Sequence, residues 1–243
     1  MFYALKYSYT DNGKSKKEII ERFEKYISVY KDRAVGISTY FENLNALYEN
    51  DNYTLIQKYS PGFLDCVMRG FWTSLIIDTA SFFDEDEETD SFINFLNYIK
   101  SNKDKIYTKT FFESKIVNGK EMEPKEVKFP KIENVVDNII KDLNYIIDKD
   151  NNELDTNAKM KQIKDVYLNI KYTRDKICAH KERKLTISNK INPLSNLDIK
   201  DISIIKDYIE ELLSKITLPY NRTYICTNPI YPNDVKNLID KLK

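Results

Sequence analysis

The sequence predicts an all-α protein, and three observations carry this prediction. Glycine occurs only five times among 243 residues, and proline is absent from 131 to 192. Residues 62–83 repeat apolar side chains at the i, i+3, i+4 spacing of one helix face. Because glycine and proline are the residues that most often interrupt helices, their scarcity favours long helices packed as a bundle.

The expected elements follow one another with short connections. A stretch of aromatic and polar residues over 2–9 favours a short strand, and a Ser-Pro-Gly sequence at 60–62 breaks the chain. Amphipathic patterns predict the helices, and Thr89 or Asp90 is expected to cap the fourth of them. The predicted helices cover 14–33, 35–50, 62–83, 91–102, 131–148, 155–181, 197–216 and 232–242.

Residues 105–130 differ from the rest of the chain. They mix β-forming residues around Asn118-Gly119, a dipeptide typical of a two-residue hairpin turn. We expect a small β-hairpin insertion there, within a single helical domain that covers 1–243.

Composition excludes several classes of function. The 38 basic and 38 acidic residues balance, which argues against a general polyanion-binding protein. The three cysteines lie far apart without zinc or disulfide spacing, and the few glycines exclude a P-loop or a dinucleotide-binding fingerprint. The acidic run 84–90 is expected to be a solvated loop and not a metal site. No cofactor, metal, membrane span or secretory signal is expected, so the cytoplasm is the expected compartment.

The stretch 172–183, YTRDKICAHKER, is the candidate site. An apolar stripe of Ile163, Val166 and Ile170 continues by four residues to Arg174, which therefore projects from a core-facing side. His180 is the only histidine of the chain. On a straight helix it lies about 120° around the axis from Arg174. Either the helix distorts or ends near Ala179, or a second, symmetry-related chain brings its own pair to a shared cleft.

These residue types suit the metal-free cleavage of RNA. One group must take the proton of a 2′-hydroxyl and another must protonate the leaving 5′-oxygen, and histidine serves both roles near neutral pH. A homodimer has two histidines across a twofold axis. The fork of Arg174 suits the stabilisation of the crowded phosphate.

The motif RDKICAH at 174–180 resembles that of the HEPN superfamily, an arginine, then often Asn, Asp or His, then a histidine. The chain is most similar to the abortive-infection-associated (AbiU-like) branch, where SFFD at 81–84, DSFINFL at 90–96 and NDVKNLIDKL at 233–242 also have counterparts. The resemblance implies a dimeric HEPN-like bundle with Arg174, Asp175 and His180 as catalytic residues. It also implies an endoribonuclease of toxin–antitoxin or antiviral defence, giving 2′,3′-cyclic phosphate ends, with a possible cognate antitoxin protein as partner.

Some related toxins carry a tyrosine two positions after the histidine, where a partner enzyme modifies them. Glu182 stands there in this chain, so we do not expect that regulation. Members without catalysis lead to the alternative expectation, a dimeric RNA- or protein-binding module.

The neighbouring residues allow two interpretations each. Lys171, Tyr172, Lys176 and Lys181 are expected to bind RNA. With 18 tyrosines in the chain, however, core packing is the favoured interpretation of Tyr172, and the lysines could equally favour a helix C-terminus. Asp78 falls on the apolar stripe of helix 62–83 and could orient Arg174 or pair with Arg69 or a lysine. In a purely structural interpretation, Arg174 pairs with Asp78 or Asp84, and His180 stabilises the end of its helix.

Overall fold

A computed structural model describes residues 15–49, 52–84, 91–110, 125–154, 156–182, 197–227, 229 and 234–242, with three two-residue strands between 111 and 124. The described chain is predominantly helical, as the sequence predicts. The expected strand over 2–9 and the caps Thr89 and Asp90 lie outside the described residues. The helices are α1 (Lys16–Tyr48), α2 (Asn52–Tyr59), α3 (Pro61–Phe82), α4 (Phe92–Ile106), α5 (Ile132–Ile147), α6 (Ala158–Glu182), α7 (Ile199–Asn221) and α8 (Asp234–Leu242).

The longest helix, α1, replaces two expected helices and corrects that prediction. It begins at a capping box, in which the Ser15 hydroxyl accepts from the Glu18 backbone and the Glu18 carboxylate accepts from the Ser15 backbone. Gly36 lies within it without a break. One face of the helix around Gly36 is buried in the core, and the side chains of Tyr30 and Ile37 are fully inaccessible to solvent. Packing of this kind outweighs the helix propensity lost at one glycine, about 1 kcal/mol.

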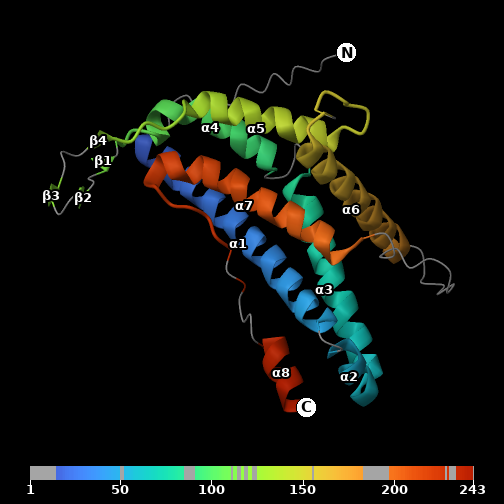
Figure 1. The fold of residues 1–243 in the computed structure, drawn as a ribbon. Helices are drawn as coiled ribbons and strands as arrows, with labels where there is room; N and C mark the ends of the chain where they lie inside the picture. The colour runs from blue at the N-terminus through green and yellow to red at the C-terminus, as the bar shows by residue number, and fades with distance from the viewer. Residues whose placement is uncertain are drawn as a thin grey trace.

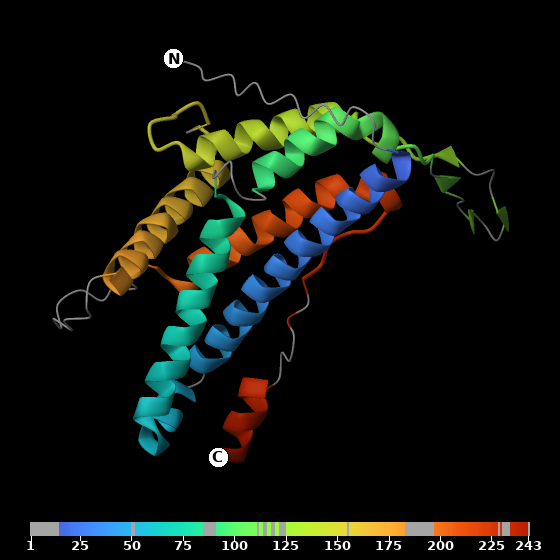
Figure 2. The same cartoon turned by 180° about the vertical axis from the view of Figure 1, so that it is seen from behind.

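The helices form one bundle around a common core (Figure 1). α1 runs beside α7 and packs on α3, while α4 and α5 lie together across one end of this group. Figure 2 shows α6 leaving α5 and extending along α3. This arrangement sets the C-terminal part of α6 beside the end of α3.

The helix α3 packs its apolar face against α1 and α6. Its side chains Leu75, Ile76 and Phe82 are fully buried, and Phe83 just after it is 2% exposed. The next helix, α4, begins after Ser91, whose hydroxyl accepts a hydrogen bond from the Asn94 backbone. A serine therefore caps α4 in the described structure, one position after the expected pair.

The last turn of α7 extends past the expected end at 216 and contains Pro219. Tyr220 holds this turn against α1, because its ring lies 4.8 Å from that of Phe23 and its hydroxyl donates to Glu24 at 2.6 Å. Arg222 ends the helix in the left-handed conformation.

Between α4 and α5 the described residues form two antiparallel pairs of short strands. β1 (Phe112–Glu113) pairs with β4 (Lys125–Glu126), and β2 (Ile116–Val117) pairs with β3 (Lys120–Glu121). They project away from the bundle (Figure 1). The expected turn at Asn118-Gly119 lies outside the described residues.

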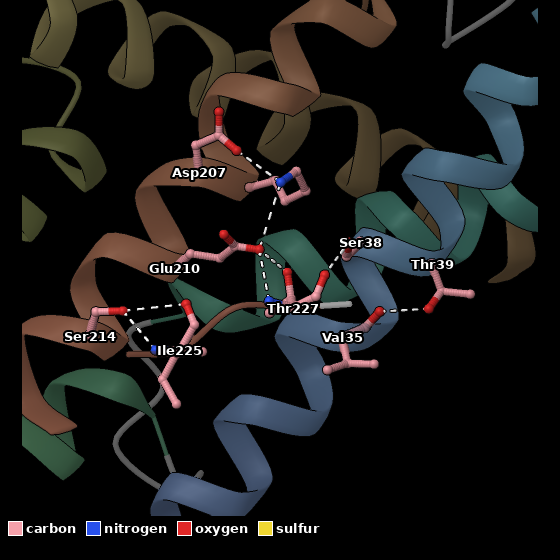
Figure 3. A network of polar contacts seen from close by, with 9 residues as sticks. Val35, Ser38, Thr39, Asp207, Glu210, Ser214, Ile225 and Thr227 are labelled. Carbon is pink, nitrogen blue, oxygen red and sulfur yellow. Dashed lines mark hydrogen bonds and ion pairs between the residues drawn. The ribbon is translucent and has the colours of Figure 1, made fainter. Parts of the chain in front are cut away.

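The chain after α7 is tied to the bundle before it reaches α8 (Figure 3). Ser38 of α1 donates to the Thr227 carbonyl at 2.9 Å, and Glu210 of α7 accepts from both the backbone and the hydroxyl of Thr227. The Ile225 backbone donates to Ser214 at 3.0 Å. This tether, residues 223–227, brings the chain to the place where α8 contacts α1 and α2.

Candidate functional site

Arg174 lies where the apolar stripe of α6 reaches the edge of the core. Ile163 and Ile170 are fully buried, and Tyr167, two turns before Arg174, is 2% exposed. The Arg174 side chain is 20% exposed. An arginine in this position keeps the aliphatic part of its side chain in the core and its guanidinium at the surface. The charge of the guanidinium needs partners.

The end of α3 supplies one of these partners. Phe83 lies between aromatic side chains of two other helices, 5.2 Å from the ring of Tyr167 on α6 and 6.5 Å from that of Tyr208 on α7. Asp84 follows directly and is 45% exposed. The packing of one phenylalanine therefore brings the carboxylate of the next residue to α6.

Two carboxylates bind the Arg174 guanidinium. Its Nε and Nη2 donate to Asp175 Oδ1, each at 3.0 Å, and its Nη1 donates to Asp84 Oδ2 at 3.3 Å. Of the two acids that the sequence offers as partners, the structure brings Asp84 to Arg174. Asp175 also faces Arg174, which helical spacing does not predict, because adjacent positions point to different sides of a helix. The long arginine side chain bends to reach it.

The charges of these partners decide the ionisation of Arg174. Burial lowers the pKa of the guanidinium, but the hydrogen bonds and charge of Asp175 and the charge of Asp84 outweigh burial and raise that pKa above its ordinary value. Arg174 is therefore a permanent cation. It suits the binding of a phosphate and not the transfer of a proton.

Asp78 lies apart from this group, against α1. A methyl group added at Gly36 would lie 3.5 Å from Asp78 Oδ2. Burial raises the pKa of the Asp78 carboxyl, and the charge of Arg33 offsets this only in part. Arg69, the partner considered for it, instead pairs with Asp65 at 3.0 Å. The described contacts thus place Asp78 near Arg33 and not at Arg174.

The exposed side of α6 next to Arg174 carries an aromatic and a cation together. Tyr172 is 59% exposed, which corrects the interpretation of it as a core residue. The Lys176 ammonium lies 5.2 Å from the centre of its ring. Lys171 and Lys176 are both partly buried. The arrangement offers a stacking surface and positive charge beside the arginine.

The helix α6 continues through position 180 without a break, to Glu182. Of the two alternatives that the sequence leaves open, an end of the helix near Ala179 is therefore not observed. On this uninterrupted helix, position 180 lies about 120° around the axis and about 9 Å along it from position 174. The side chains of His180 and Lys181 lie outside the described part of the structure.

The other places considered in the described structure offer fewer polar or charged side chains than the surroundings of Arg174. No group of three or more metal-ligating side chains occurs among the described residues, although the 85–90 run lies outside them. A pocket of about 220 Å³ between α1, α2, α3 and α8 has an apolar lining that includes Leu47, Phe63 and Leu238. None of the described helices is both long enough and apolar enough to cross a membrane.

Comparisons of the chain with protein-family models, with curated proteins and with solved structures found no match.

Proposed function

We propose that this chain is a metal-independent endoribonuclease of the HEPN type that acts as a homodimer. The observation that carries the proposal is the continuity of α6 from Arg174 through position 180. With these positions about 120° apart, one straight helix does not direct both side chains at one phosphate. A second copy of α6, related by a twofold axis, supplies the missing arginine and histidine to a shared cleft.

The reaction in such a cleft needs no metal. One His180 takes the proton of a ribose 2′-hydroxyl, and the 2′-oxygen then attacks the adjacent phosphorus. The bond from phosphorus to the 5′-oxygen breaks, and the second His180 protonates that oxygen. Arg174 binds the non-bridging oxygens as negative charge accumulates on them. The products are a 2′,3′-cyclic phosphate and a 5′-hydroxyl.

The surface around Arg174 suits a single-stranded RNA. Tyr172 offers an exposed ring for a base, and Lys171, Lys176 and Lys181 provide charge for the phosphates on either side. Asp175 holds Arg174 through two hydrogen bonds. We place this activity in the cytoplasm, in a toxin–antitoxin or antiviral defence system, with an antitoxin protein as a partner.

The same surface supports a second candidate, a dimeric RNA- or protein-binding module that does not cut. The exposed Tyr172 beside Lys176 favours it, because stacking and charge are enough for binding. The two candidates differ in the need for His180.

Cleavage of mixed RNA by the purified protein in EDTA tests the proposal. We expect Arg174→Ala and His180→Ala each to lower the cleavage rate by about 100-fold or more, since each removes a group that acts in the transition state. Arg69→Ala is the matched control, because Arg69 is an exposed arginine of α3 that pairs with Asp65. It is expected to cut like the wild type.

The outcomes separate the two candidates. Equal cleavage by all variants identifies a contaminating nuclease and contradicts the proposal. RNA that is bound but never cut, with binding weakened by Arg174→Ala and kept by His180→Ala, supports the binding module.

A further inference from the structure

Three of the five N–H donors of Arg174 bind carboxylates in the free protein. Asp175 Oδ1 accepts from the Nε and Nη2 edge, which is one of the two edges with which an arginine binds a phosphate, and Asp84 Oδ2 accepts from Nη1. One guanidinium and two carboxylates carry a net charge of −1. A phosphate that approaches the guanidinium must compete with two carboxylates for these donors.

We propose that Asp84 is a latch on Arg174, a carboxylate that RNA must displace before the guanidinium can bind phosphate. This inference rests on the proposed function, in which Arg174 holds the scissile phosphate. It adds regulation to that site, because a carboxylate competes with the phosphate for the arginine in the free protein.

The positions of the two acids show which one can be released. Asp175 lies on α6 with Arg174 and moves with it, whereas Asp84 comes from the end of α3. The Asp84 side chain is 45% exposed, so water, salt and a ligand can reach this ion pair. Exposed ion pairs are weak and screened by salt, so a multivalent RNA can replace this contact.

The substitution Asp84→Asn has opposite expected effects if Asp84 is a latch on Arg174 and if it only positions Arg174. If Asp84 merely positions Arg174, Asp84→Asn weakens RNA binding and slows cleavage. If Asp84 is a latch, Asp84→Asn removes one negative charge at the phosphate site and leaves only a neutral oxygen to accept from Nη1, so binding becomes tighter. The direction of the change therefore distinguishes the two roles.

Binding of an uncleavable 2′-O-methyl RNA oligonucleotide, followed by fluorescence anisotropy at low salt, measures this direction. We expect Asp84→Asn to tighten binding about three- to tenfold. Asp65→Asn is the matched control: it removes one exposed carboxylate of an ion pair on the same helix, and it is expected to change affinity less than about twofold. Asp84→Ala is the second variant, should the first fail to fold.

A double variant tests whether Asp84 acts through the arginine. We expect Arg174→Ala to weaken binding and Asp84→Asn to give no gain in that background. A gain that persists without Arg174, a gain no larger than that of Asp65→Asn, or a loss of affinity in Asp84→Asn overturns the latch while leaving the nuclease intact. If Arg174→Ala neither weakens binding nor slows cleavage in EDTA, the proposed function itself fails.

Discussion

Asp78 places an ionisable group where the fold favours its neutral form. Burial raises the pKa of this carboxyl above its ordinary 3.8, and Arg33 opposes the shift only in part. The folded protein therefore holds the proton more tightly than the unfolded chain. The favourable contribution of the neutral form is present at low pH and is lost as the pH rises from about 3.8 through the raised pKa.

We therefore expect Asp78→Asn to stabilise the protein at neutral pH and to flatten its stability between pH 4 and the raised pKa. The gain is on the order of 0.5 kcal/mol, or roughly 1–2 °C in Tm, because the group remains partly hydrated. Thermal unfolding at several pH values measures it, with the exposed Asp65→Asn as control. A lower Tm for Asp78→Asn at neutral pH would show that the ionised carboxylate is stabilising.

Single residues of the site were partly predictable. The i, i+4 stripe of α6 identifies Arg174 as a cation at the edge of the core, and the structure agrees. The sequence did not predict whether Asp78 or Asp84 pairs with Arg174, since both lie near the C-terminal end of the predicted helix 62–83. It depends on the insertion of Phe83 between Tyr167 and Tyr208, three residues from three helices. Tyr172 was misjudged because the frequency of tyrosine in the core says nothing about one position.

At the scale of elements, α8 is the least embedded helix. It contacts α1 and α2, and the fully buried Ile239 is its anchor. A helix of nine residues is not stable alone in water, so its structure depends on this docking. Leu238 beside it remains 42% exposed.

We expect Ile239→Ala to release α8 while the rest of the bundle stays folded. The lost burial and the cavity cost about 2–4 kcal/mol. This is a large part of the free energy with which so small a helix docks on the bundle. Hydrogen exchange resolved by segment should show lost protection in 234–242 and unchanged protection in α3 and α7. Lys236→Ala, at an exposed position of the same helix, is the control. Lost protection throughout the bundle would contradict local release.

Helices with strong apolar periodicity were predicted nearly to their ends, as for α3, α5 and α6. The helix α2 was not predicted, and two further errors occurred where a local signal was outweighed by packing. The sequence predicts a break between 33 and 35, but α1 continues there because Ala34 and Ile37 are buried. Pro219 reads as a terminator, but contacts of Tyr220 with Phe23 and Glu24 hold the last turn of α7. Neither contact is visible in a local window of sequence.

For the whole molecule, the proposed cleft requires two copies. If both His180 side chains serve one cleft, a chain that lacks the histidine inactivates its partner. After subunit exchange in an equal mixture of wild type and His180→Ala, we expect roughly a quarter of the all-wild-type activity and not half. The same mixture with the active Arg69→Ala is expected to lose nothing. A result near one half would show that each chain acts alone.

The sequence predicted a helical bundle but not which helices lie together. The apolar faces of α1, α3 and α7 are chemically alike, so patterns alone do not decide their pairing. Polar contacts over long separations, such as that of Tyr98 with the Ile19 carbonyl, help to fix it.

The bond between Ser38 and Thr227 joins positions 189 residues apart. During translation, the side of α1 that contacts α7 and this late segment stays uncovered until both have been synthesised. At ordinary ribosome speeds this takes roughly 10 to 40 s. Until then a nascent chain exposes apolar residues such as Ile37, which the finished protein hides completely. Production of this protein in cells should therefore depend on chaperones that hold the growing polypeptide until its final helices emerge.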